Sequence, residues 1–301
     1  MKFEAEEISN LVKIHSAVLL FGVAGLFGKL LDISSINIVA GRTFFASLAL
    51  LPILYTSQTN LALLRKSDYA VLPSLGILLA LHWITFFKSI QVSSVAIGLL
   101  TYATFPVFVA FLEPFLIKTR WQLTDLLLAV VVFGGLVLII PDYDPGKRVE
   151  LGVIYGTLSG LLFALLTIFN RKYVQRYSAL KVATWQNIGA FLVLAPLTCQ
   201  ALPRITPVQV GYLLLLGTVC TALAHTLFIG GMRTIKARTA SIVAALEPVY
   251  GIVAAYFLLG EVPVTRTLIG GGIIVGCAVF ITFRTYRGSR QVAIGDHSAG
   301  I

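Results

Sequence analysis

The sequence predicts an all-α integral membrane protein with ten transmembrane helices arranged as two inverted five-helix repeats. The first observation behind this fold class is composition. The chain has 301 residues, of which 57% are hydrophobic and only 12% are charged, whereas soluble domains carry about 25% charged residues. The second is a series of apolar runs near 20 residues, the length that crosses a hydrocarbon core of about 30 Å. The third is a set of features that recur 142 positions apart.

The apolar runs predict one transmembrane helix each, because a helix satisfies its own backbone hydrogen bonds in lipid. A transmembrane barrel would instead show segments of about ten residues that alternate apolar and polar side chains. The connections between the runs are short, so we expect no inserted soluble domain. In order, the ten predicted spans are 14–31, 36–54, 70–89, 94–113, 121–140, 151–170, 179–199, 207–229, 237–259 and 265–283.

The basic residues between these spans predict the orientation of the chain. With ten spans both termini share one side, which holds 16 of the 23 Lys and Arg residues, while the other side holds 7. The positive-inside rule therefore places both termini in the cytoplasm. The N-terminus MKFEAEEISN is acidic and no signal-peptide cleavage site follows it. We expect a multi-pass protein of the bacterial inner membrane.

Several residues coincide when the first half is shifted by 142 positions onto the second. Phe27 falls on Phe169, Lys29 on Arg171, Pro106 on Pro248 and Gly134 on Gly276. Chance identity in a low-complexity apolar sequence is the alternative explanation. Because five is odd, a second half that repeats the first must be inverted in the membrane, which is typical of secondary transporters with a site near the bilayer midplane.

This repeat predicts the domain organisation, with the polar stretch 141–150 as the boundary between the halves. We expect a cytoplasmic segment at 1–13, a first repeat at 14–145, a second repeat at 146–285 and a cytoplasmic tail at 286–301.

Two related stretches resemble a known family. They are ALEPVYGIVAAYFLLGE at 245–261 and TFPVFVAFLEPFLIKTR at 104–120, and GRTFFAS at 41–47 adds to them. The pattern resembles the EamA branch of the drug/metabolite transporter superfamily over residues 14–285. One departure is Thr119, where that family often has an acidic residue; Glu261 keeps the acid of the second half. The resemblance implies a permease for amino acids, other metabolites, nucleotide-sugar-like molecules or cationic drugs.

Glu247 is the candidate with the sharpest chemistry. It lies about 15 Å along the ninth predicted helix, near the middle of the bilayer, and Pro248 follows it. An acid at this depth is suited to carry a proton or to bind a substrate amine. The structural alternative is that it stabilises the backbone carbonyl that Pro248 leaves without a donor.

Six further polar or aromatic residues at membrane depth are candidates for substrate binding. His82 and Trp83 suit the wall of a mixed polar and apolar pocket, although a lone histidine is more often a packing residue. Arg42 is suited to bind a carboxylate, or it extends to the interface, and Gln186 occupies a similar position in the second half. Tyr102 and Tyr250 fit aromatic walls or ordinary core packing.

Other function classes find little support in the sequence. The net charge of +10 follows from the orientation signals, so we expect no nucleic-acid partner. There is no phosphate-binding loop, HExxH or CxxC motif, and we expect no metal and no cofactor. Asp142 and Asp144 resemble the acids of a membrane transferase but fit a solvated loop better. Two GxxxG patterns fit packing within the bundle better than dimerisation, so we expect a monomer or weak dimer.

The sequence therefore predicts a non-enzymatic secondary transporter for small metabolites, amino acids among them. It would work by alternating access. The family resemblance favours export, and proton coupling through Glu247 is a hypothesis. A membrane-embedded transferase and a non-transporting scaffold are the alternatives.

Overall fold

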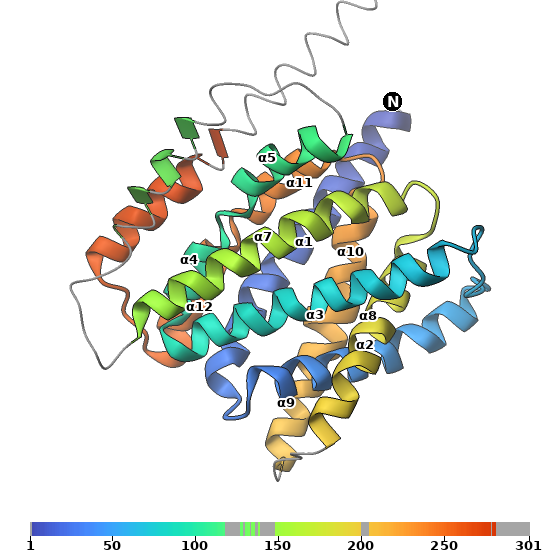
Figure 1. The fold of residues 1–301 in the computed structure, drawn as a ribbon, viewed down its shortest axis with the longest axis horizontal. Coiled ribbons are helices and arrows are strands. Elements are labelled where there is room, and N and C mark those ends of the chain that lie inside the picture. The colour runs from blue at the N-terminus through green and yellow to red at the C-terminus, as the bar shows by residue number, and fades with distance from the viewer. Residues whose placement is uncertain are drawn as a thin grey trace, which may run out of the picture.

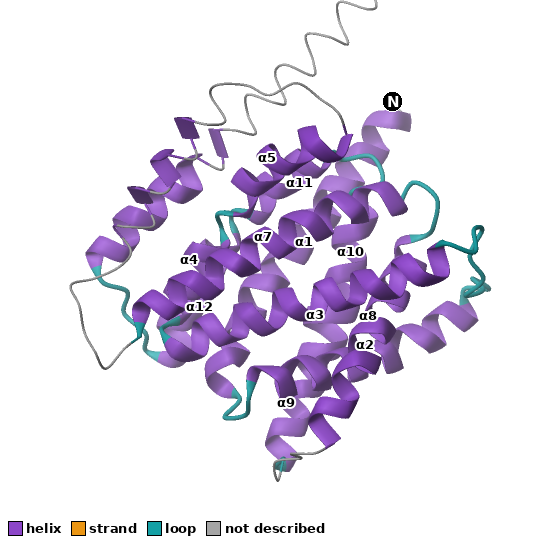
Figure 2. Ribbon diagram, in the orientation of Figure 1, coloured by secondary structure: helices purple, strands orange, loops and turns teal. Residues whose placement is uncertain are grey.

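The computed structural model describes residues 2–117, 127–128, 130–132, 134–135, 138, 148–199, 205–277 and 279–280. Every regular element in these residues is a helix, and none is a strand (Figure 2). The predicted span 121–140 falls mostly outside them. Thr119, the loop with Asp142 and Asp144, and the tail 286–301 lie outside them altogether.

The helices are arranged side by side as a bundle (Figure 1). In chain order they are α1 (Lys2–Leu30), α2 (Ser35–Thr56), α3 (Asp68–Val92), α4 (Val95–Tyr102), α5 (Phe105–Ile117), α7 (Val149–Tyr173), α8 (Ala179–Cys199), α9 (Pro207–Gly217), the π-helix η1 (Thr218–Leu223), α10 (Ala224–Gly231), α11 (Ala237–Ala244), α12 (Glu247–Leu259) and a further apolar helix, Thr265–Cys277.

Seven stretches of the described chain are long and apolar enough to cross a membrane. Two of the seven join shorter elements, Val95–Leu116 across α4 and α5 and Pro207–Gly231 across α9, η1 and α10. The helices Glu247–Leu259 and Thr265–Cys277 are apolar but shorter. The prediction of an all-α fold is confirmed for the described residues, where nine of the ten predicted spans coincide with helices.

Two of the predicted spans are broken at the same relative position. α4 ends at Tyr102 and α11 ends at Ala244, 142 residues later, and α5 and α12 begin after two-residue breaks. The hydrogen bonds agree too: the Val107 N–H donates to the Thr104 carbonyl, and the Val249 N–H donates to the Leu246 carbonyl, both at 3.0 Å. Pro106 and Pro248 lack the N–H that would continue each helix, so the sequence itself explains the breaks.

A π-helical turn interrupts the span that begins with α9. In η1 the Thr221 hydroxyl donates to the carbonyl of Leu216 at 2.7 Å, five residues earlier. Such turns are rare and are frequently found at functional sites. No sequence pattern predicted this one, and α3, which occupies the corresponding place in the first half, is continuous.

The contacts between helices are reciprocal for the two halves of the chain. α1 packs on α10 and α12, while α7, the first helix after position 148, packs on α3, α4 and α5. α2 and α8 pack on each other (Figure 1). The first helix of each half therefore contacts the third and the broken fourth span of the other half.

One glycine on α1 and one on α7 allow the broken spans to approach closely. A Cβ added at Gly22 would lie 3.0 Å from the carbonyl oxygen of Glu247, and one added at Gly160 would lie 2.8 Å from the carbonyl oxygen of Tyr102. A contact under about 3 Å forces the backbone apart, so larger residues would push α1 and α7 away from the two breaks.

Hydrogen bonds connect the loops at the end of the bundle where α7 ends and α8 begins, which we call the α7–α8 end. The Tyr177 hydroxyl donates to Asp68 at 2.5 Å and accepts from the Leu64 N–H at 3.0 Å. Burial, followed by this bond to Asp68, raises the pKa of the Tyr177 hydroxyl. Trp185 Nε1 donates to the Leu61 carbonyl at 3.1 Å. The loop between α2 and α3 is thus held against the second half.

Candidate functional site: a central cavity between the two halves

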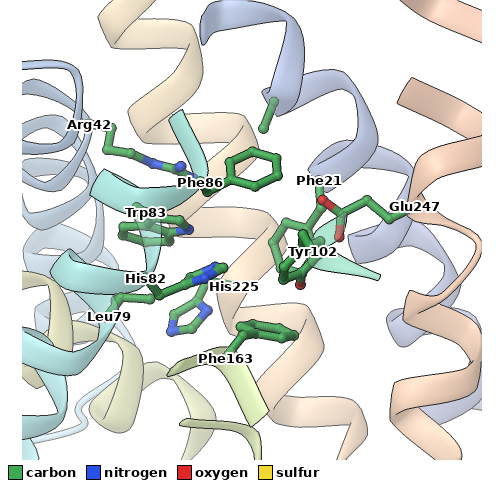
Figure 3. A pocket seen from close by; sticks show the side chains of 11 residues that line it. Phe21, Arg42, Leu79, His82, Trp83, Phe86, Tyr102, Phe163, His225 and Glu247 are labelled. Carbon is green, nitrogen blue, oxygen red and sulfur yellow. The ribbon is translucent and has the colours of Figure 1, made fainter. Parts of the chain in front are cut away.

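A small cavity lies between the two halves of the bundle (Figure 3). Its volume is about 20 Å³, which holds about one water molecule. The first half contributes residues from α1, α2, α3 and α4, and the second half contributes residues from α7, α10 and α12. They are Phe21, Ala24, Arg42, Leu79, His82, Trp83, Phe86, Tyr102, Phe163, His225 and Glu247.

Aromatic side chains form most of the wall, and several are related by the 142-residue shift. Phe21 corresponds to Phe163, and Trp83 corresponds to His225. The members of the second pair contact each other, with ring centroids 5.9 Å apart. Phe228 corresponds to Phe86 and lies 5.7 Å from both Phe21 and Phe163. The aromatic frame is therefore built from equivalent positions of both halves.

Arg42 is the cation of the cavity and is almost completely buried, with 1% of its surface exposed. Its guanidinium carbon lies 3.7 Å from the centroid of Trp83, within the range of a cation–π contact. Nε donates to the Thr221 hydroxyl at 2.9 Å, and Nη2 donates to the Cys220 carbonyl at 3.3 Å. Both acceptors belong to η1, so the π-helical turn supplies groups that hold the arginine in place. The alternative that Arg42 extends to the interface is therefore wrong.

Glu247 is the acid of the cavity and stands at the first position of α12, directly after the break. It is buried, the Tyr102 hydroxyl lies within reach of its carboxyl group, and its Oε2 has no hydrogen-bond partner in the described chain. Arg42 and Glu247 lie on opposite sides of the cavity (Figure 3) and form no direct ion pair. An oxygen without a partner at this depth is costly to bury, which marks it as a group that a ligand or water can satisfy.

Ser159 on α7 fixes the ring of His82. The His82 Nδ1 lies 3.1 Å from the Ser159 carbonyl oxygen and 2.8 Å from its hydroxyl, and that hydroxyl donates to the His82 carbonyl at 3.0 Å. We assign the ring hydrogen to Nδ1, because a carbonyl oxygen only accepts. His82 is therefore a hydrogen-bonded group with Nε2 as its remaining acceptor.

A chain of hydrogen bonds leads from His225 into the protein. His225 Nε2 lies 2.9 Å from Gln186 Oε1, and Gln186 Nε2 donates to Asn170 Oδ1 at 2.6 Å. Since the Gln186 oxygen is the acceptor, we assign the ring hydrogen to Nε2 and leave Nδ1 as the acceptor of His225. All three residues are buried.

Of the seven candidates predicted from the sequence, some line the cavity and others lie outside it. Five line the cavity: Glu247, His82, Trp83, Arg42 and Tyr102. Gln186 stands behind His225 and is not part of the wall, and Tyr250 packs against Gly22 outside the cavity.

Six residues that line the cavity were not among the candidates predicted from the sequence. They are the aromatic residues Phe21, Phe86, Phe163 and His225 and the aliphatic residues Ala24 and Leu79. The repeat could have identified some of these residues, because the shift of 142 positions relates Phe21 to Phe163 and the predicted candidate Trp83 to His225. No group of three or more His, Cys, Asp or Glu that would suit a metal ion occurs among the described residues.

Comparison with known proteins adds a family to this geometry. The model of the EamA-like transporter family matches residues 11–140 and 150–283. The chain belongs to the EamA-like transporter family. The two matched stretches divide at the polar boundary between the halves.

Among the relatives of this EamA-like protein are curated transporters of similar length. An uncharacterized transporter of Archaeoglobus fulgidus is 29% identical over 90% of this chain and 94% of that protein. An S-adenosylmethionine uptake transporter of Rickettsia felis is 26% identical over 83% of each. A protein of known crystal structure has a similar fold, with a TM-score of 0.68 and 16% sequence identity. The match covers 93% of this chain and 97% of the chain in that structure. This likeness concerns the fold alone. The EamA-like protein is a multi-pass membrane transporter.

Proposed function

We propose that this EamA-like protein is a secondary transporter that works by alternating access between two inverted five-helix halves, residues 14–145 and 146–285. Three features support the proposal. The two broken spans have the same hydrogen bonds 142 residues apart, the contacts between helices are reciprocal, and the family model matches the two halves as separate stretches. A site between inverted repeats is the arrangement that such transporters use.

The cargo that fits the cavity best is a zwitterion with an amino-acid head group. The observation that carries this is the placement of Arg42 and Glu247, two buried groups of opposite charge on opposite walls with no direct ion pair between them. A guanidinium binds carboxylate with charge-assisted hydrogen bonds. Glu247, His82 Nε2 and His225 Nδ1 are acceptors for an ammonium group, and the aromatic frame packs against the rest of the molecule.

The names of the Rickettsia relatives agree with this chemical class. S-adenosylmethionine combines an amino-acid head group with a positively charged sulfonium and an adenine ring. A cation and a flat ring both pack well on aromatic faces. The proposal therefore covers ordinary amino acids and larger molecules that carry the same head group.

The cavity of about 20 Å³ is too small for such a cargo, since ligand sites are usually about 300–1,000 Å³. The structure accordingly supports an assignment to an occluded state, from which rocking of the halves would open the site to one side at a time. The termini would lie in the cytoplasm and the membrane would be the bacterial inner membrane. Export and proton coupling through Glu247 stay predictions.

Counterflow in proteoliposomes tests the proposed function. Purified protein is reconstituted with unlabelled cargo inside and the labelled compound outside, using separate trials with radiolabelled phenylalanine, methionine, lysine and S-adenosylmethionine. We expect transient accumulation of at least one compound, and competition by free amino acids but not by analogues that lack the carboxylate or the amine. Accumulation that both truncated analogues inhibit as well as the parent compound would contradict the zwitterion proposal.

A further inference from the structure

A polar face of α7 continues from the cavity toward the α7–α8 end of the bundle. Phe163 lines the cavity, and Thr167 and Asn170 follow it at helix positions i+4 and i+7, on the same face. At about 1.5 Å per residue they lie about 6 and 10 Å further along the helix. Asn170 is three residues before the end of α7 at Tyr173.

Both residues of this face have buried polar atoms without a partner. The hydroxyl of Thr167 and the side-chain nitrogen of Asn170 have no hydrogen-bond partner among the described residues, and both side chains are fully buried. Leaving a buried donor unpaired costs about 1–3 kcal/mol. Two such donors on one face indicate a place that water or a ligand occupies at some stage.

Gln186 and His225 complete this polar region. They connect Asn170 to the cavity wall through the two hydrogen bonds of 2.6 and 2.9 Å. The four residues come from three helices of the second half, α7, α8 and α10. The side chains of these four residues are all uncharged in the assigned state, in contrast to Arg42 in the cavity wall.

We propose that Thr167 and Asn170 form an inner subsite, with Asn170 held in place by Gln186 and His225, which binds the carboxylate of the cargo between the cavity and the cytoplasm. The inference rests on the proposed function and deepens it. The subsite offers a hydroxyl and an amide N–H, which are hydrogen-bond donors of the kind that hold carboxylates. A guanidinium binds a carboxylate through two parallel charge-assisted hydrogen bonds, whereas the inner subsite offers single neutral donors, so the cargo is held firmly beside Arg42 and released more readily from the inner subsite.

Chemical labelling of a cysteine at Thr167 tests this proposal without any transported cargo. The three native cysteines are first replaced (Cys199→Ser, Cys220→Ala, Cys277→Ala). Thr167→Cys, which preserves volume, is then introduced. The matched control is Leu166→Cys, the neighbouring and equally buried position on another face of α7. Each variant is treated from either side of the membrane with an anionic sulfonatoethyl or a cationic trimethylammonium-ethyl methanethiosulfonate, after gel filtration has established that it is folded.

We expect Thr167→Cys to react from the cytoplasmic side with the anionic reagent about tenfold faster than Leu166→Cys, since the unpaired amide N–H of Asn170 on the same face can donate to the sulfonate. It should also react faster with the anionic than with the cationic reagent. Equal rates for the two positions, or a preference for the cationic reagent, would overturn the inner subsite. Labelling requires no transport. The labelling result can therefore contradict the inner subsite while counterflow supports the proposed function, and the reverse outcome is also possible.

Discussion

The first and second halves of this transporter share a backbone plan but differ in their polar side chains. The breaks after Tyr102 and Ala244 have the same hydrogen bonds, and both halves contribute aromatic residues from corresponding positions. The charged groups do not correspond: Glu247 falls on Phe105, and Arg42 falls near Gln186. The comparison teaches that the backbone plan is shared, whereas the charged groups on which the proposed recognition of a cargo depends occur in one half each.

Removal of the unmatched cation is expected to have the largest effect. Arg42→Gln takes away the guanidinium and leaves the Cys220 carbonyl and Glu247 without their positive neighbour. We expect counterflow to fall about a hundredfold or more, which corresponds to about 3 kcal/mol. Arg42→Lys keeps the charge but not the planar fork and should restore part of the rate. Gln186→Leu, the change at the second-half counterpart, should cost less, and equal losses would contradict the asymmetry.

The second prediction separates the two broken spans. Glu247→Gln keeps the volume but removes the charge, so we expect transport in proteoliposomes to lose its response to an imposed pH gradient. Binding of cargo should weaken about tenfold, or about 1.4 kcal/mol, because a charge-assisted contact to the ammonium is lost. Phe105→Leu is the matched control in the other break and should keep the response. A Glu247→Gln protein with unchanged pH dependence would exclude this residue as the proton carrier.

The third prediction examines the feature that the halves share. Pro106→Ala and Pro248→Ala each restore a backbone N–H and allow a continuous helix. If the breaks act as equivalent hinges, each change should slow exchange by a similar factor, about three- to tenfold, with little effect on affinity. Single-turnover exchange rates and equilibrium binding measure the two quantities separately. A slow rate in only one variant would show that the hinges are not equivalent.

The smallest effect is expected at the α7–α8 end. Tyr177→Phe removes the hydrogen bonds to Asp68 and from Leu64 and should lower the stability by about 1–2 kcal/mol, as measured by thermal unfolding in detergent. Because the pKa of this hydroxyl is raised in the folded protein, its contribution is present below about pH 10, the usual pKa of tyrosine, and is lost as the pH rises further.

Gln91→Leu is the control for Tyr177→Phe, because Gln91 lies at the end of the bundle opposite the α7–α8 end. It removes a single bond of 2.8 Å from Gln91 to the Ile33 carbonyl. The loss should be about 1 kcal/mol or less and should not change between pH 6 and pH 11, the range over which Tyr177 is followed. A pH-dependent loss in Gln91→Leu would mean that the dependence has another origin.

The sequence by itself determined the helices, and it contains the two prolines at which helices break and the features that recur 142 positions apart. Apolar run length specifies where a helix crosses lipid, and a proline removes a backbone donor wherever it stands, so these features are local and readable. Five of the seven candidates reach the cavity for the same reason, since depth along a helix follows from counting residues.

Only the tertiary structure decided which groups meet. Three such features involve residues more than 30 positions apart in the chain. They are the hydrogen bond that His225 donates to Gln186, the placement of Arg42 between Trp83 and the π-helical turn, and the position of Arg42 across the cavity from Glu247. The rotation of each helix about its own axis sets these contacts. Close packing fixes that rotation, and an all-round apolar helix carries almost no trace of it in its sequence.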